Sequence, residues 1–229
     1  MLPTSETWRT KMANPRMSQL IAHTKIRLQV RFPRCRFLVV FGSTNYDFSH
    51  MPVAEYLLAQ ELGRQLSSLK DVERLVLLTG GNPVTGIAIG NHSPKLRVVH
   101  LCPTEFTMPP TARGEVWTDV GLTMAERQMI LASAADIAVS FGGGPGTRNE
   151  LEIAGMLEHC KVVPLMFTGG ASLGASLANL NLANPRQLAA WDRIIKVDGT
   201  ALERAAATPT AWQAIVERLA SDILLILMS

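Results

Sequence analysis

The sequence predicts an α/β protein with one doubly wound, mostly parallel sheet and helices on both faces. Three observations support this Rossmann-like fold class. Short apolar runs rich in β-branched residues alternate with helical segments along the chain. The runs are apolar throughout, as in strands that are covered on both sides. Three of them end in glycine-rich corners, at 41–44, 79–86 and 141–147.

The predicted elements follow from these alternating runs. Strands are expected at 37–42, 74–81, 96–102, 136–144, 161–170 and 193–197, and helices at 52–66, 124–134, 148–159 and 210–227. The segment after Gly86 reaches the next strand at about Leu96, which leaves little room for a full helix. Sheets of this kind bind ligands at the carboxyl ends of their strands, near the point where the strand order reverses. We therefore expect the three glycine corners to meet at one cleft.

Composition and charge divide the chain into two parts. Its 229 residues are 47% apolar and 18% charged, which is ordinary for a soluble, core-forming domain. Residues 1–37 carry eight Lys and Arg against the single acid Glu6, whereas the remainder has 14 Lys and Arg against 18 Asp and Glu. The prediction is a basic N-terminal extension at 1–36 followed by a Rossmann-like domain at 37–229.

The basic extension has three interpretations. It resembles a mitochondrial transit segment in being basic and poor in acids, or it is an arm for nucleic acid or anionic lipid. We favour a solvated extension with a short helix at 17–21, because Leu20 and Ile21 offer apolar surface that can dock on the body. No nucleic-acid partner is then expected, and the protein is expected in the cytoplasm, with mitochondrial import as the alternative. No apolar run approaches the ~20 residues of a membrane span, so no membrane partner is expected.

The three cysteines, Cys35, Cys102 and Cys160, are far apart in the sequence. Their odd number and wide spacing indicate a reducing compartment without a disulfide framework, and the spacing is not that of a zinc site. Cys102 lies in the apolar run VVHLC and is expected in the core. No metal site is predicted.

The stretch SFGGGPGTRNELE at 140–152 predicts an anion site at the start of a helix. Glycines allow positive φ and let backbone N–H groups approach a ligand, and the free N–H groups of a helix start favour negative charge. Gly143, Gly144, Gly146 and Thr147 are the candidate phosphate ligands, with the Thr147 hydroxyl also able to cap the helix. The stretch lacks the Lys-Ser/Thr pair of a Walker loop and the third glycine of the dinucleotide fingerprint. Taken alone, it is equally well explained by a tight turn without a ligand.

Charged side chains accompany this stretch. Glu150 is expected in the first turn of the helix, where it either stabilises the helix start by ~0.3–1 kcal/mol or faces a substrate sugar. Arg127, on the preceding helix, is a candidate second ligand for an anion, although an arginine on a helix is more often solvated. Asp136 directly precedes a strand, and we expect it to be structural.

These residues resemble the Lonely Guy phosphoribohydrolases, also labelled lysine decarboxylase-like, within the wider SLOG group of Rossmann-like nucleotide-binding proteins. The family pattern has an arginine on a helix, an aspartate nine residues later and then PGGxGTxxE. Here Arg127, Asp136 and GGGPGTRNE, ending at Glu150, keep the same intervals. The corners FGSTNYD and TGGNPVTGIAIG resemble the family's upstream glycine segments more weakly, and the resemblance covers roughly residues 37–167.

The resemblance implies hydrolysis of the N-glycosidic bond of a nucleoside 5′-monophosphate, which releases free base and ribose 5-phosphate. It also implies a homodimer and no metal or redox cofactor. Arg127 and Glu150 would be the catalytic pair. The phosphate would lie on the glycine loop that carries Gly143, Gly144, Gly146 and Thr147, with help from Ser43 and Gly81.

Three departures from the family pattern support a second interpretation. Gly142 replaces the family's proline, Gln128 its lysine and Asn149 the first acid of its final pair. The triple glycine is more similar to the SLOG branch of molybdenum-cofactor carrier proteins, which bind a phosphorylated pterin cofactor. The alternative is therefore a non-catalytic carrier or sensor for a nucleotide or pterin. Amino-acid decarboxylation is not expected, because it normally needs pyridoxal phosphate on a lysine, and Lys161 lies beyond the cleft segments.

Overall fold

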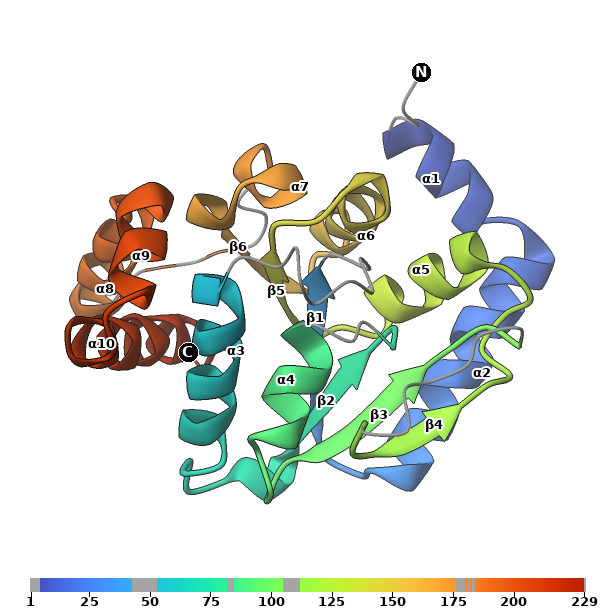
Figure 1. Ribbon diagram of the computed structural model, residues 1–229. Coiled ribbons are helices and arrows are strands. Elements are labelled where there is room, and N and C mark those ends of the chain that lie inside the picture. The colour runs from blue at the N-terminus through green and yellow to red at the C-terminus, as the bar shows by residue number, and fades with distance from the viewer. Residues whose placement is uncertain are drawn as a thin grey trace.

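One parallel sheet forms the centre of the molecule (Figure 1). The computed structural model describes residues 5–42, 53–81, 85–104, 112–175, 180, 182 and 184–228. Within them the strands run in the order β4-β3-β2-β1-β5-β6, and every pairing is parallel. The strands are β1 (Arg36–Gly42), β2 (Leu75–Thr79), β3 (Arg97–Leu101), β4 (Glu115–Trp117), β5 (Ile137–Phe141) and β6 (Lys161–Leu165). The predicted fold class is confirmed.

The strand order reverses between β1 and β5. The chain builds β1 to β4 outward to one edge and then returns to place β5 on the free side of β1. As a result the last residues of these two strands, Gly42 and Phe141, are partners in the ladder. This is the place where sheets of this class bind ligands, because the following loops diverge and leave a crevice.

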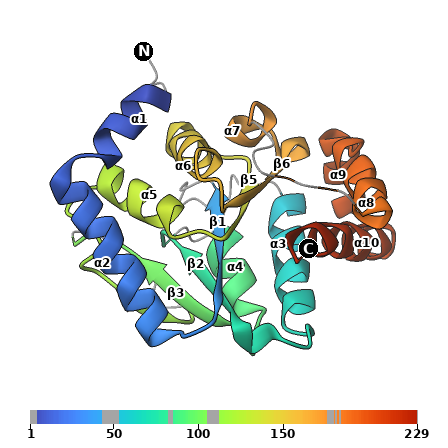
Figure 2. The same ribbon diagram turned by 180° about the vertical axis from the view of Figure 1, so that it is seen from behind.

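Helices cover both faces of the sheet (Figures 1 and 2). Alternate residues of β1 enter two separate cores, with Leu38 and Val40 in one and Val39 and Phe41 in the other. The first core is completed by α3 (Val53–Leu66), α4 (Thr85–Asn91), α8 (Pro185–Ile195), α9 (Gly199–Ala206) and α10 (Pro209–Leu227). The second contains side chains of α1 (Ser5–Met12), α2 (Pro15–Arg31), α5 (Met124–Ser133) and α6 (Pro145–Gly155). The 3-10 segments η2 (Val72–Arg74) and η3 (Met166–Thr168) and the short helix α7 (Gly170–Leu173) complete the described elements.

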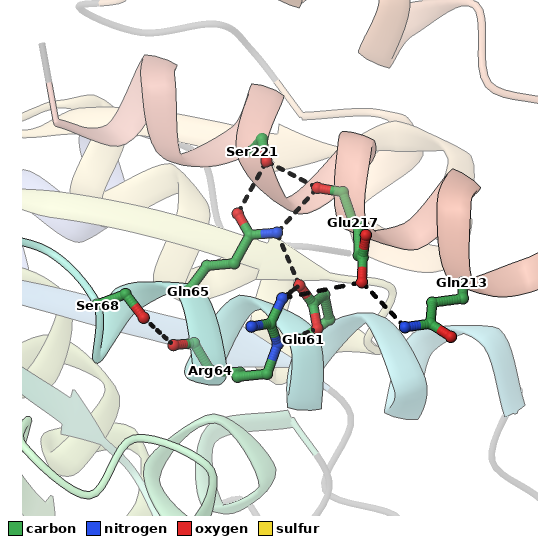
Figure 3. Close-up of polar contacts among 7 residues, drawn as sticks. All are labelled: Glu61, Arg64, Gln65, Ser68, Gln213, Glu217 and Ser221. Carbon is green, nitrogen blue, oxygen red and sulfur yellow. Dashed lines mark hydrogen bonds and ion pairs between the residues drawn. The ribbon is translucent and has the colours of Figure 1, made fainter.

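The C-terminal helix α10 is fixed to α3 by polar contacts as well as by apolar packing (Figure 3). Gln65 of α3 donates from Nε2 to the Glu217 carbonyl at 2.9 Å, and its Oε1 lies 2.9 Å from the Ser221 hydroxyl of α10. Glu61 orients Gln65 through a 2.7 Å hydrogen bond and pairs with Arg64 at 2.6 Å. The last predicted helix is thus present and belongs to the domain.

One predicted strand is wrong. Residues 193–197 do not form a strand, because 193–195 are the end of α8. The Asn184 side chain accepts the Arg186 N–H at 2.8 Å and Pro185 occupies the first helical position, so the local sequence starts a helix. Trp191 and Ile194 are both buried, which is the spacing of one helix face and not of a strand.

Further elements differ from the sequence prediction, among them β4 and α2. The three-residue strand β4 was not predicted. It pairs with β3 through Val99 and Glu115, and its three residues are too few to form a recognisable strand pattern in the sequence. The N-terminal helix α2 runs over Pro15–Arg31 and is much longer than the expected 17–21, with Asn14 capping its first turn. Among the residues described, no helix has the length and hydrophobicity to cross a bilayer.

Candidate functional site

The glycine loop after β5 makes a left-handed turn into α6. Gly142 and Gly143 have φ of 48° and 87°, a region in which side chains with a Cβ are strained. A Cβ on Gly143 would also overlap the Thr147 hydroxyl. Gly144 is the N-cap, and Pro145 begins the helix at a position where a missing N–H costs nothing. The local sequence therefore determines both the turn and the start of α6.

The loop is held by its carbonyl groups. The Gly142 carbonyl accepts the Ser172 N–H at 3.1 Å, the Gly143 carbonyl accepts the Ala171 N–H at 2.9 Å, and both donors belong to α7. The Gly142 N–H donates to Thr168 Oγ1 at 2.6 Å. These bonds use both carbonyl groups and the Gly142 N–H, but not the Gly143 N–H.

Four backbone N–H groups of the loop remain without a hydrogen-bond partner among the described residues. They belong to Gly143, Gly144, Gly146 and Thr147, the four predicted phosphate ligands. Gly144 is exposed, and the space where its Cβ would lie is open. A set of unpaired donors at a helix start is what an oxyanion requires.

Thr147 has a different local role from the one predicted. Its hydroxyl does not cap α6; it donates to the Gly42 carbonyl at 2.9 Å. Thr147 lies in the first turn of α6, and Gly42 ends β1, so this bond joins the two sides of the crevice. The predicted ligand Ser43, directly after Gly42, lies outside the described residues.

Arg127 and Glu150 form a buried ion pair beside the loop. The Arg127 Nη1 and Glu150 Oε1 atoms are 2.5 Å apart, and the two residues are 3% and 4% exposed. The predicted pair is therefore brought together, although Arg127 is not solvated. Glu150 lies in the second turn of α6 and not in the first, so it does not serve as an acid at the helix start. Burial raises the pKa of Glu150, and the adjacent guanidinium offsets part of this rise.

Arg127 retains an unused donor. Its Nε atom is buried and has no hydrogen-bond partner. The guanidinium lies against Gly80, where a Cβ would overlap it, so this glycine makes room for the arginine at the end of β2. A buried donor without a partner is costly, and it indicates a position that a ligand or water atom can satisfy.

The turn after β2 is held by a buried chain of hydrogen bonds. The Gly81 N–H donates to Thr79 Oγ1 at 3.1 Å, and Thr79 Oγ1 lies 2.6 Å from His100 Nδ1. The Nε2 atom of His100 is 3.0 Å from the Arg113 carbonyl and must donate to it, so Nδ1 accepts from Thr79. Burial lowers the pKa of His100, which is consistent with this neutral tautomer. The predicted ligand Gly81 lies here with φ of 76°, but its N–H is already used.

Glu55 of α3 lies at the edge of the candidate site and was not predicted from the sequence. Its Oε1 lies 3.3 Å from the position of a Cβ on Gly142, and it lines a cavity of about 470 Å³ together with Met166, Phe167, Thr168 and Glu203. Burial and the nearby Glu203 raise the pKa of Glu55 to about 7. A single acid in an apolar helix, PVAEYLLAQ, was the only signal available in the sequence.

Two predicted structural roles are confirmed by the contacts. Asp136 accepts the Phe37 N–H at 2.8 Å and thereby ties the start of β5 to β1. Cys102 is fully buried. Within the described part of the chain, no three His, Cys, Asp or Glu side chains converge in a way that would hold a metal ion.

Comparisons with known proteins support the fold. No protein-family model matches the chain, and no curated protein matches it either. Among solved structures, the structural-genomics protein TM1055 is similar, with a TM-score of 0.51 and 28% identity over 60% of this chain and 78% of that one. The Moco carrier protein from Chlamydomonas reinhardtii has a TM-score of 0.47 and 20% identity over 71% of this chain and 98% of its own.

A third structure, the molybdenum cofactor binding protein from Rippkaea orientalis, has a TM-score of 0.42 and 19% identity over 57% of this chain and 77% of that one. The similarity to TM1055 agrees with a Rossmann-like α/β fold. The chain is thus a Rossmann-like protein with a glycine-rich loop at its topological switch point, where four backbone N–H groups lack partners among the described residues.

Proposed function

We propose that this protein binds the phosphate of a nucleoside 5′-monophosphate on the loop 142–147 and hydrolyses its N-glycosidic bond. The observation that carries the proposal is the arrangement of the loop. Its carbonyl groups are held by α7, while four N–H groups at the start of α6 lack partners among the described residues. The helix dipole adds a favourable interaction with a bound anion.

The reaction would proceed at the Arg127 and Glu150 pair. As the bond between the base and C1′ breaks, its electrons go to the base nitrogen and the sugar develops oxocarbenium character. The Glu150 carboxylate would stabilise that positive charge and orient a water molecule. Water supplies the hydroxyl group at C1′ and the proton that the departing base takes. Arg127 would bind a phosphate or ribose oxygen through its unused Nε donor.

Binding without turnover is the second candidate. Arg127 and Glu150 pair with each other and are almost completely buried, so neither is presented to a ligand in this structure. A carrier or sensor for a nucleotide or a phosphorylated pterin needs the loop but does not need a free carboxylate. The replacement of the family's proline by Gly142 points the same way.

Base release separates the two candidates. The wild-type protein is incubated with a panel of nucleoside 5′-monophosphates, and free base is quantified by chromatography. We expect release from at least one of them, and a reduction of kcat by roughly 10²–10⁴-fold in Glu150→Gln, because the amide cannot supply the negative charge. Tight binding of a nucleotide or pterin without release in the wild type would favour the carrier instead.

The loop itself is tested by Gly144→Val. Gly144 has φ of −106°, and its Cβ direction is open, so valine is accommodated and adds bulk at the N-cap of α6, whose N–H groups are unpaired. We expect loss of nucleotide affinity of at least tenfold with an unchanged melting temperature. Gly174→Val is the matched control, because Gly174 also has open space at its Cβ and ends α7 away from those donors. Equal affinity in Gly144→Val and wild type would remove the loop from the site. The homodimer stays a prediction, which sedimentation velocity can check.

A further inference from the structure

The N-terminal helices lie across the two helices that carry Arg127 and Glu150 (Figures 1 and 2). Helix α2 packs against α5, and α1 packs against α6. Trp8 of α1 is only 2% exposed and belongs to the same core cluster as Leu151 of α6. The segment 5–31, here called the strap, is therefore packed on the body of the protein.

Two polar contacts of the strap end next to the buried pair. Trp8 Nε1 donates to Glu152 Oε2 at 3.1 Å. Glu152 lies two residues beyond Glu150, about 200° further round α6. One face of α6 is thus held by the strap while the opposite face presents Glu150 to Arg127.

The second contact holds the start of α5. The Arg16 guanidinium pairs with both carboxylate oxygens of Glu126, the residue directly before Arg127. Glu126 Oε2 also accepts the Leu122 N–H at 2.7 Å, and its own N–H donates to Thr123 Oγ1, the cap of α5. Arg16 therefore pairs with Glu126, whose hydrogen bonds hold the start of α5. Glu126 lies within one turn of Arg127.

The remaining ion pairs of α2 are far from the pair in the fold. Arg27 meets Asp119 at 2.7 Å, and Arg31 meets Glu115 at 2.7 Å on the edge strand β4. Arg31 and Arg16 are similarly exposed, at 61% and 55%, but Glu115 is 39% exposed and Glu126 only 14%. Among the ion pairs described for α2, only that of Arg16 involves a residue of α5, which makes Arg31 a control for the loss of an exposed arginine partner.

We propose that Trp8 and Arg16 are positioning residues, and that the strap sets the placement of Arg127 relative to Glu150 by holding α5 and α6 from outside. This inference rests on the proposed function for its catalytic consequence, but its structural part stands without it. Reacting groups must be placed within a fraction of an ångström, and small displacements caused by distant changes lower rates strongly. The strap contacts supply such placement from a segment that does not itself reach the glycine loop.

The test compares Arg16→Ala with Arg31→Ala in the full-length protein. With AMP as the probe nucleotide, we expect Arg16→Ala to lower kcat for base release, or nucleotide affinity if there is no turnover, by about five-fold or more. Arg31→Ala should stay within about two-fold of wild type, because an exposed pair at a remote strand contributes little. Arg16→Lys should recover part of the loss. Equal effects of Arg16→Ala and Arg31→Ala would overturn the catalytic consequence.

Hydrogen exchange of the ligand-free protein tests the strap separately from the proposed function. We expect Arg16→Ala to speed exchange in 124–133, and Trp8→Phe, which removes only the indole N–H, to speed exchange in 145–155. Arg31→Ala should leave both segments unchanged. If wild type neither binds nor hydrolyses nucleotides but these local changes in exchange occur, the proposed function fails, while the proposal that the strap holds α5 and α6 stands. Unchanged exchange in both segments overturns the strap itself.

Discussion

At the scale of single residues, the site is built from buried polar groups whose environments differ. Arg127 and Glu150 compensate each other, whereas Glu55 has raised pKa because burial and the neighbouring Glu203 both oppose its charge. His100 remains neutral and holds a turn. The family resemblance carried by Arg127, Asp136 and Glu150 implied that Arg127 and Glu150 act as a pair, and the structure brings their side chains into contact. No sequence pattern predicted that Glu55, on a helix far from Gly142 in the chain, would lie next to Gly142.

Glu55→Gln should make stability less dependent on pH. The folded-state pKa of Glu55 is about 7 against an ordinary 4.5, so its contribution to stability is fully present below pH 4.5 and is lost as the pH rises through about 7. Glutamine has no charge to bury, so at pH 8 we expect the variant to be more stable than wild type by about 1–2 kcal/mol. The gain should vanish near pH 4 in chemical denaturation. Glu158→Gln, at an exposed position, is the control, and a gain that persists at low pH would contradict the assignment.

At the scale of elements, glycine determines the connection between β5 and α6. Gly142 has φ of 48° and donates its N–H to Thr168 Oγ1 at 2.6 Å. A proline at this position would have neither property. The anchor itself, between Gly142 and a threonine after β6, depends on a tertiary contact that no local pattern carries.

Gly142→Pro should be strongly destabilising. Proline requires φ near −65° and has no N–H, so the variant loses both the turn and the bond to Thr168, at a cost of about 3 kcal/mol or more. Thr168→Val removes the Oγ1 that accepts the Gly142 N–H and donates to the Leu165 carbonyl, and it should cost about 1–3 kcal/mol. Thermal or urea unfolding measures both. If the proline variant is as stable as wild type, the loop does not have the conformation described here.

Most elements were predictable because each apolar run is bounded by glycine or polar residues. The failure at 193–197 has a simple cause. RIIKV has the composition of a strand, but the helix that is capped at Asn184, nine residues upstream, continues to Ile195. A short apolar run can be assigned to a helix or a strand only together with the helix start signal upstream of it. The edge strand β4 is held by β3 alone, so its own three residues gave little to recognise.

At the scale of the whole molecule, the basic extension and the domain share one core. Leu28 of α2 is fully buried among sheet residues, whereas Val30, two positions later, is 77% exposed. The charge asymmetry of the sequence separated residues 1–36 from the rest, but charge does not report where apolar side chains pack. The basic residues of α2 instead meet acids of the body, including Asp119 and Glu115.

We propose that the chain unfolds as one cooperative unit from residue 5 onward. Leu28→Ala should lower the free energy of unfolding by about 2–5 kcal/mol, since it leaves a cavity between α2 and the sheet. Val30→Ala should change it by less than about 0.5 kcal/mol. Fluorescence and circular dichroism should give coincident transitions in urea for wild type. An early transition confined to the N-terminal helices in the Leu28 variant would show that they are a separate unit.

The bond between Thr147 and Gly42 has a consequence for how the protein is made. Gly42 ends β1, and Thr147 lies in α6 directly after β5, the neighbour of β1 in the sheet, so β2, β3 and β4 are synthesised between the two partners. Pairings over such separations form late, because the intervening chain must first be ordered. A growing polypeptide therefore cannot form this loop arrangement until α6 has been synthesised and β5 has docked on β1, and α7, which holds the loop carbonyls, is synthesised later still. An anion bound as proposed would then act on a nascent chain only after α7 has been made.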